Sequence, residues 1–112
     1  MKTVFKTLTD NKKASQKRRE FEASTGLKWD CYHTGAGMGF TPIVTRETPM
    51  DEAAALALLP HLPKQGIGFV KLAETSGMEL ATVLMGAKTL VKTARAVGVV
   101  NRMGHFAGIY SK

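Results

Sequence analysis

Basic side chains dominate the last part of the chain, and the chemistry that suits them is phosphate binding. Residues 80–112 contain no Asp or Glu. Their Lys and Arg residues are Lys88, Lys92, Arg95, Arg102 and Lys112. Cationic side chains without neighbouring carboxylates attract polyanions, and the phosphate backbone supplies much of the affinity of proteins for nucleic acids. This segment therefore predicts a nucleic-acid-binding surface that presents its cations outward.

The charge of the whole chain is segregated. The net charge is +7, made up of +5 for residues 1–28, −3 for residues 29–79 and +5 for residues 80–112. Segregated charge builds a directional field, whereas a merely soluble protein tends to intersperse its charges. The pattern favours nucleic acid as the partner, and a solvated charged surface is the alternative.

Three of the basic residues have the spacing of one helix flank. Lys88, Lys92 and Arg95 are four and three positions apart, and such positions are neighbours on a helix. We expect them to contact phosphates. The face opposite the predicted core stripe holds small residues, namely Thr82, Gly86, Thr89, Thr93 and Ala96. Its threonines are the candidates for contacts with base edges. The alternative is that this small-residue face packs against another helix, for instance in a dimer.

Two further groups of basic residues extend the predicted DNA-binding surface. Arg102 and His105 are expected at the tip of a C-terminal β-ribbon, within reach of a minor groove or a phosphate. A second phosphate-contacting cluster lies on a polar helix near the N-terminus. Its members are Lys12, Lys13, Lys17, Arg18 and Arg19.

The elements that must position these residues can be predicted from caps and periodicity. Residues 3–8 predict a short strand, and residues 12–23 a helix that Asn11 or Ser15 could cap and that ends at Gly26. Residues 27–33 and 40–46 alternate like strands, and residues 35–39 form the hairpin loop between them. Thr48 and Pro49 are typical of a helix start, so we expect a helix that ends near Pro60. Apolar residues recur at helical spacing over residues 79–97.

The order of these elements resembles the winged helix-turn-helix superfamily. A helix at 49–59, an extended piece at 66–68, a helix at 69–75, a glycine turn at 76–78, a long helix at 79–97 and a ribbon at 99–111 follow that order. Val-Lys-Leu-Ala-Glu-Thr-Ser-Gly-Met at 70–78 is similar to the helix and turn of bacterial and phage regulators. The resemblance implies an α+β fold with three helices and a C-terminal β-hairpin wing.

The resemblance divides the chain into a DNA-binding domain, residues 48–112, and an N-terminal extension, residues 1–47, made of a basic helix and a β-hairpin. The helix-turn-helix has two candidate registers. In the first, residues 79–97 form one continuous recognition helix. In the second, residues 79–84 are the positioning helix, residues 85–87 the turn and residues 88–95 the recognition helix.

Other kinds of chemistry find little support in the sequence. The chain has no His-Glu-x-x-His motif and no paired cysteines. Residues 35–39 lack the Gly-Lys-Ser/Thr that would follow in a phosphate-binding loop. Cys31 and His33 share a strand face with Trp29, which favours packing over catalysis. We therefore expect no enzymatic activity, no cofactor and no metal. No apolar run is long enough to span a membrane and the first residues are unlike a secretory signal, so we expect a cytoplasmic, nucleoid-associated protein.

The sequence thus predicts a small protein that binds double-stranded DNA with some sequence preference. The expected type is a transcriptional regulator or DNA accessory protein of a phage or plasmid, acting as a homodimer and reading DNA with helix 79–97 and a basic wing. Two alternatives stay open. One is a docking module that binds or inhibits a host protein, and the other is RNA binding through the aromatic residues.

Overall fold

The computed structural model of the chain describes residues 3–34 and 37–112. The side chains of residues 3–12, 14, 33–34 and 37–38 lie outside this description. The described residues form an α+β structure with four α-helices and two small antiparallel sheets. The chain divides into two compact units, Met1–Phe40 and Thr41–Lys112, and each is described by itself.

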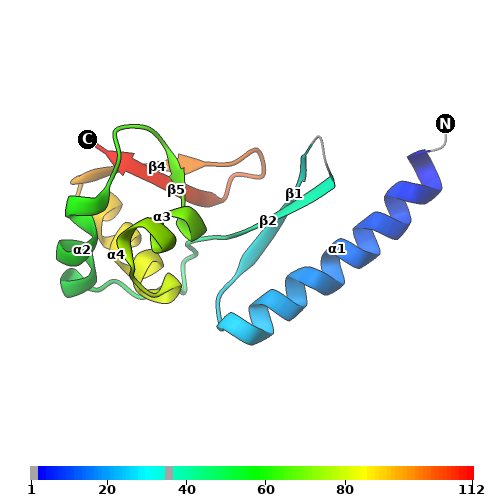
Figure 1. Cartoon of the computed structure of the whole chain (residues 1–112), viewed down its shortest axis with the longest axis horizontal. Helices are drawn as coiled ribbons and strands as arrows, with labels where there is room; N and C mark the ends of the chain where they lie inside the picture. The colour runs from blue at the N-terminus through cyan, green and yellow to red at the C-terminus, as the bar shows by residue number, and fades with distance from the viewer. Residues whose placement is uncertain (1–2, 35–36) are drawn as a thin grey trace. The chain divides into compact units, whose positions relative to one another are not determined.

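The first unit consists of a long helix followed by a β-hairpin. Helix α1 spans Thr3–Thr25, strand β1 Trp29–Thr34 and strand β2 Gly37–Pro42 (Figure 1). The strand predicted at residues 3–8 is wrong, because these residues are helical and continue into the basic helix without a break. Strand propensity is a weak prior that depends on a sheet surface to pack against. The predicted helix end is confirmed, since Gly26 has a positive φ of 71° and its N–H donates to the Glu22 carbonyl at 2.8 Å.

Aromatic packing joins helix and hairpin in the first unit. The Phe21 ring stacks on Trp29 with centroids 4.6 Å apart, and Phe40 lies 5.4 Å from Phe21. Trp29 Nε1 donates to Thr25 Oγ1 at 2.8 Å, so the buried indole has its polar atom satisfied. Strand β2 begins at Gly37, so the hairpin loop is shorter than the predicted residues 35–39, of which 35 and 36 lie outside the described residues.

The second unit contains three α-helices and a three-stranded sheet of order β3-β5-β4, and the helices lie on one side of the sheet (Figure 1). Its elements are α2 (Glu52–Leu58), the 3₁₀ turn η1 (Leu59–His61), β3 (Ile67–Gly68), α3 (Phe69–Ser76), α4 (Leu80–Lys92), β4 (Ala96–Val100) and β5 (Phe106–Ser111). The extended piece, the second helix and the ribbon that the sequence predicted are confirmed. The turn between β4 and β5, residues 101–105, is called the β4–β5 turn below.

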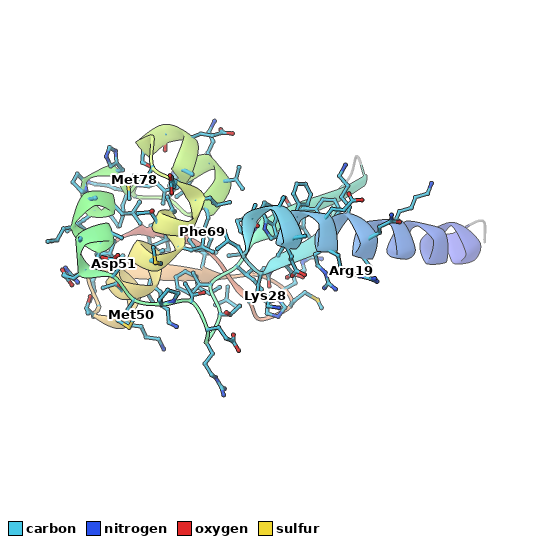
Figure 2. All side chains as sticks on the ribbon, turned by 90° about the horizontal axis from the view of Figure 1, so that it is seen from below. Arg19, Lys28, Met50, Asp51, Phe69 and Met78 are labelled. Atoms are coloured by element: carbon cyan, nitrogen blue, oxygen red, sulfur yellow. The ribbon has the colours of Figure 1, made fainter. Side chains whose placement is uncertain are left out.

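Helix α2 begins three residues later than predicted. Its N-cap is Asp51, which is labelled in Figure 2. The Asp51 carboxylate accepts a hydrogen bond from the Ala54 N–H at 3.1 Å. Thr48, the predicted cap, instead accepts a hydrogen bond from the Thr45 N–H at 2.9 Å. Both residues can satisfy backbone N–H groups, but Asp51 satisfies one within the first turn of the helix, which is what capping requires.

Helix α4 is one continuous helix, as the first register predicts, but it ends five residues before the predicted position. The second register, with its break in the helix, is wrong. Residues 80–92 form one helix, which rules out a turn at 85–87, and the helix stops at Lys92, which rules out continuation to 97. The chain leaves the helix through Ala94, which has a positive φ of 60°. Its N–H donates to the Val91 carbonyl at 3.1 Å, and the Arg95 N–H donates to the Leu90 carbonyl at 2.8 Å. Glycine usually occupies such a left-handed position, so an alanine here does not indicate a helix end in the sequence.

The core of the second unit lies where α4 meets its neighbours. Val83, Leu84, Ala87 and Leu90 are buried, which confirms this part of the predicted apolar stripe. They pack with the fully buried side chains Leu58, Phe69, Leu72 and Ile109, of which Phe69 is labelled in Figure 2. This core holds α4 between α2, α3 and the sheet.

Helices α2 and α4 approach each other closely at Gly86. A Cβ atom at this position would lie 2.8 Å from the Ala54 carbonyl oxygen and 3.2 Å from the Ala55 nitrogen. Both contacts are with backbone atoms, which cannot move aside independently. Ala54 and Ala55 are themselves buried small residues, so the two helices meet along a seam of small side chains.

Replacing Ala94 with glycine is expected to stabilise the protein. An L-residue in the left-handed region costs about 1–2 kcal/mol that glycine does not pay, and part of this gain is lost to the greater freedom of glycine in the unfolded chain. We expect Ala94→Gly to raise the free energy of unfolding in urea by about 0.5–1 kcal/mol. The matched control Ala57→Gly, at an exposed helical position, should lower it. A loss of stability in both variants would contradict the assigned helix end.

Replacing Gly86 with alanine is expected to destabilise the protein, although alanine is the better helix former by about 1 kcal/mol. The added methyl group would force α2 and α4 apart, and such overpacking costs about 1–3 kcal/mol. The control is Gly68→Ala, because a Cβ there meets no atom within 4 Å and the backbone φ is −74°. Chemical denaturation should show a clear loss for the first variant and little change for the second, and equal values would rule out the close approach.

Candidate nucleic-acid interface

The small-residue face of α4 lies inside the fold. Gly86 and Thr89 are buried, and Thr82 is half-buried. Thr89 Oγ1 accepts a hydrogen bond from the Asp51 N–H at 2.8 Å and donates one to the Met85 carbonyl at 2.9 Å. The prediction of an exposed Thr89 that contacts bases is wrong, because α2 covers this face. The alternative weighed for this face, packing against a helix, is what the structure has, and the helix is the chain's own α2.

Helix α4 offers few exposed side chains along its length. Between Leu80 and Val91 every residue is buried or half-buried, and Lys92 is the first exposed one. Thr93, next in the chain, is also exposed, and its hydroxyl donates to the Thr89 carbonyl at 2.7 Å. The prediction that α4 presents an open face to a groove therefore fails for most of the helix. Only its C-terminal end is open to a ligand.

Lys88 does not point into solvent as predicted. Its ammonium group donates hydrogen bonds to the carbonyl oxygens of Thr45 at 3.0 Å, Arg46 at 3.0 Å and Thr48 at 2.5 Å. A lysine ammonium has three N–H groups, so these bonds use all of them. The side chain thus ties residues 45–48 to α4, and its role as a direct phosphate contact is not supported by this geometry.

Arg95 is paired with a carboxylate of the same chain. Its guanidinium donates two hydrogen bonds to the Glu52 carboxylate, at 2.6 and 2.7 Å, and its Nε donates to Thr93 Oγ1 at 2.8 Å. The hydrogen bonds to Arg95 hold the pKa of Glu52 below its ordinary value of 4.5, and those to Glu52 raise the pKa of Arg95. The expectation of an unpaired outward Arg95 is therefore wrong. Arg95, which belongs to the segment without Asp or Glu, is thus paired with a carboxylate on α2.

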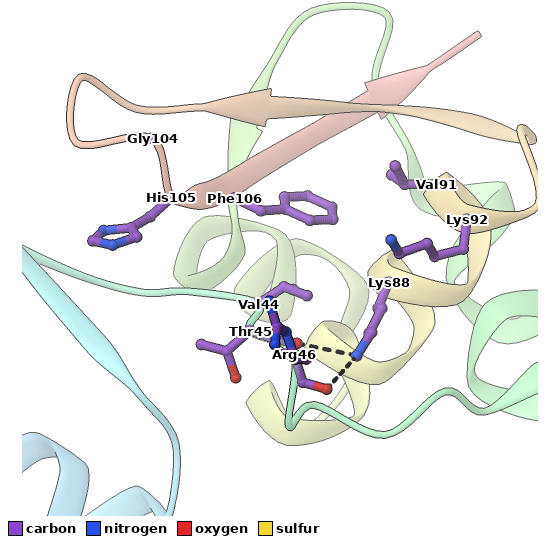
Figure 3. A pocket seen from close by; sticks show the side chains of 9 residues that line it. All are labelled: Val44, Thr45, Arg46, Lys88, Val91, Lys92, Gly104, His105 and Phe106. Carbon is purple, nitrogen blue, oxygen red and sulfur yellow. Dashed lines mark hydrogen bonds between the residues drawn. The ribbon is translucent and has the colours of Figure 1, made fainter.

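Two of the exposed cations that remain, Arg46 and Lys92, line one cleft of the second unit (Figure 3). We call it the basic cleft, and its volume is about 710 Å³. It is lined by Val44, Thr45, Arg46, Lys88, Val91, Lys92, Gly104, His105 and Phe106. Three chain segments meet there, namely residues 44–46, the C-terminal half of α4 and the end of the β4–β5 turn.

The basic cleft combines positive charge with an apolar wall. Arg46 and Lys92 are exposed, and no carboxylate is among the lining residues. In Figure 3 the Lys92 side chain extends toward the cleft and the Phe106 ring lies in it. Val44, Val91 and Phe106 supply the apolar part. Such an arrangement can bind an anion and can also contact an apolar portion of the same ligand.

Sequence reasoning missed Arg46, because it lies in the acidic middle of the chain. The structure brings it to the cleft through a backbone bridge, in which the Val44 N–H donates to the Phe106 carbonyl at 2.9 Å. One signal in the sequence could have pointed to it, since Arg46 is the only Lys or Arg between Lys28 and Lys64. Its long-range neighbours, however, cannot be read from local pattern.

The β4–β5 turn carries the predicted residues Arg102 and His105, and both are exposed. Asn101 organises this turn, because its side-chain oxygen accepts hydrogen bonds from the N–H groups of Met103 and His105, each at 3.0 Å. Gly104 has a positive φ of 83°, as a tight turn requires. Arg102 therefore lies on an ordered turn next to the basic cleft.

The basic cluster of the first unit lies on α1. Lys13, Lys17 and Arg19 are exposed, and Arg19 is labelled in Figure 2. Arg18 is half-buried, and its Nε has no hydrogen-bond partner among the described residues. The side chain of Lys12 lies outside the described residues. Lys13 and Lys17, four positions apart, lie on the same side of α1, whereas Arg19 lies on another side of the helix.

The part of the chain that the structure describes contains no group of three or more His, Cys, Asp or Glu that could hold a metal ion. Cys31 is a free, half-buried thiol. None of the described helices combines the length and the apolar character needed to cross a membrane.

Comparisons with protein-family models, with curated proteins and with solved structures find no match to the chain. Similarity therefore assigns neither a family nor a function to this protein. The case for a function depends on the charges, contacts and burial of the residues described above.

Removing the Lys88 ammonium is expected to loosen residues 45–48. Lys88→Met keeps most of the apolar stem and leaves three carbonyl oxygens without their charged donor. Hydrogen bonds to charged groups contribute about 1.5–3 kcal/mol, and partial exposure places the expected loss at about 1–2 kcal/mol. Hydrogen exchange of residues 45–48 should also become faster. Lys71→Met, at an exposed position of α3, is the control and should change stability by less than about 0.5 kcal/mol. If the two variants had the same stability and the same hydrogen exchange, the hydrogen bonds of Lys88 would not hold residues 45–48 in place.

Proposed function

We propose that the second unit is a winged helix that binds double-stranded DNA mainly through backbone phosphates. Two observations support the fold assignment. The elements follow in the order α2, β3, α3, α4, β4 and β5, and β5 lies between β3 and β4 in the sheet. The resemblance to the winged helix-turn-helix superfamily implies this order of elements along the chain, with the β4–β5 turn as the wing.

The observation that carries the proposal is the convergence of cations on the basic cleft. Arg46 and Lys92 come from two segments far apart in the sequence, the β4–β5 turn adds Gly104 and His105, and no carboxylate lines the cleft they share. Cations on one cleft can contact neighbouring phosphates of one strand. Each phosphate that they neutralise releases condensed counterions, and this release favours binding. Arg102 on the adjoining turn extends this surface.

The burial of α4 shapes the expected mode of binding. A recognition helix reads bases with exposed side chains in the major groove. Here only Lys92 and Thr93, at the C-terminal end of α4, are exposed. Contacts with phosphates position a protein on DNA but carry no sequence information directly. We therefore infer that binding depends on charge and shape, with weaker sequence preference than a fully exposed helix would give.

A protein-docking role is the second candidate, and the outer face of α2 favours it. Leu56 is 59% exposed and Met50 51%, with the exposed Ala53 and Ala57 beside them. Apolar side chains gathered on one exposed face often mark a site of protein association. A docking role of this kind would not depend on the cations of the basic cleft, so the experiment below separates the two candidates.

Loss of one cation in or beside the basic cleft is expected to weaken DNA binding and reduce its salt dependence. Fluorescence anisotropy with a labelled duplex of mixed sequence would be measured over a range of NaCl concentrations. Arg46→Ala, Lys92→Ala and Arg102→Ala should each weaken binding by about 0.5–1.5 kcal/mol. Each should also lower the slope of log K against log salt by about one unit.

The matched control for this titration is Lys64→Ala, an exposed lysine in the segment before β3. It removes the same charge from the unit without touching the basic cleft, so its slope should stay close to that of the wild type. If all four variants lose affinity equally, binding is due to overall charge and the cleft has no special role. If the wild type does not bind duplex DNA at all, the proposed function is wrong.

A further inference from the structure

We propose that the basic cleft accepts one unpaired nucleotide of a DNA strand, with its phosphate at the cationic rim and its base against the apolar wall. The inference depends on the proposed function, because it names the form of DNA that this same site prefers. DNA with a bulged or terminal unpaired nucleotide is then a better ligand than a fully paired duplex.

The size of the cleft argues for more than a phosphate. A phosphate on the outside of a duplex needs only a surface with exposed cations. The basic cleft is an open groove with a volume of about 710 Å³, which lies within the range of roughly 300–1,000 Å³ usual for clefts that bind small ligands. A single phosphate group would leave most of this space empty.

The lining of the cleft matches the two parts of a nucleotide. Arg46 and Lys92 offer charge for the phosphate, while Val44, Val91 and Phe106 offer an apolar surface. In an intact duplex the faces of the bases are covered by stacking. Only an unpaired base can present its face to such a wall, and aromatic side chains are the usual partners of unpaired bases.

The apolar wall is held in place before any ligand arrives. The Val44 N–H donates to the Phe106 carbonyl at 2.9 Å, and the Phe106 ring packs against Phe69 with centroids 5.5 Å apart. Strand β4 leaves room for this ring, since a Cβ atom at Gly98 would lie 3.2 Å from it. A site that is already formed pays less ordering entropy on binding.

The basic residues at the cationic rim have different roles, because Lys88 is occupied by hydrogen bonds within the chain. All three N–H groups of its ammonium are used by the carbonyl oxygens of residues 45–48. This leaves the direct phosphate contact to Arg46 and Lys92, which line the cleft and are both exposed. Lys88 thereby acts as a positioning residue that holds the segment bearing Arg46.

The inference is tested by comparing the affinity of the protein for a blunt duplex with that for the same duplex carrying one bulged thymidine. We expect the wild type to bind the bulged duplex roughly tenfold more tightly, as one base stacked on an aromatic ring would give. Phe106→Leu should bring the ratio of the two affinities close to one. Tyr32→Leu, which removes an exposed aromatic ring from the first unit, is the matched control and should leave the ratio unchanged.

A second measurement guards against a Phe106 variant that fails to fold. A photoreactive 4-thiothymidine at the bulge of the same duplex should cross-link wild-type protein within residues 44–46 or 104–106. Cross-links confined to other segments would overturn the inference. It is also overturned if the wild type binds both duplexes equally, an outcome that leaves the proposed function standing.

Two further outcomes complete the test. If the wild type binds neither duplex, the proposed function fails and the inference fails with it. If an RNA duplex of the same sequence and bulge binds more tightly than the DNA, the partner named here is wrong.

Discussion

The candidate interface depends on one cluster of hydrogen bonds, in which the Lys88 ammonium binds three backbone carbonyls of residues 45–48. These bonds hold an irregular segment against the middle of α4. The same segment is joined to the start of β5 by the Val44 N–H. Arg46, between these two attachments, consequently faces the space between α4 and the β4–β5 turn. Without them the basic cleft would lose one of its three sides.

Some basic residues of the C-terminal third form hydrogen bonds within the chain, and others are exposed to solvent. Arg95 is paired with Glu52, and Lys112 donates a hydrogen bond to the Ala94 carbonyl at 3.1 Å where the chain leaves α4. Lys92 and Arg102 are exposed near the basic cleft. A basic segment can thus use some of its charge to hold its own fold together. The candidate ligand site therefore holds fewer cations than the charge count of this segment suggests.

Much of the fold could be predicted because its signals are local. Gly26 and Gly77, the alternation around Trp29 and the apolar spacing over Val83 to Leu90 all act within a few residues. The misses have long-range causes. The end of α4 depends on Ala94 adopting a left-handed conformation that alanine rarely adopts, and Thr89 is buried because α2 approaches Gly86. Of the predicted site, the sequence indicated Lys92, Arg102 and His105, whereas Arg46 required the tertiary contacts of residues 44–48.

The central claim is that DNA phosphates meet the protein at the basic cleft. Amide chemical shifts of the isotope-labelled protein, followed during titration with a short DNA duplex, test it most directly. The account predicts that the largest changes fall on residues 44–46, on Lys92 and Thr93, and on the β4–β5 turn. Changes centred on the outer face of α2, with the amides of the cleft unaffected, would contradict it.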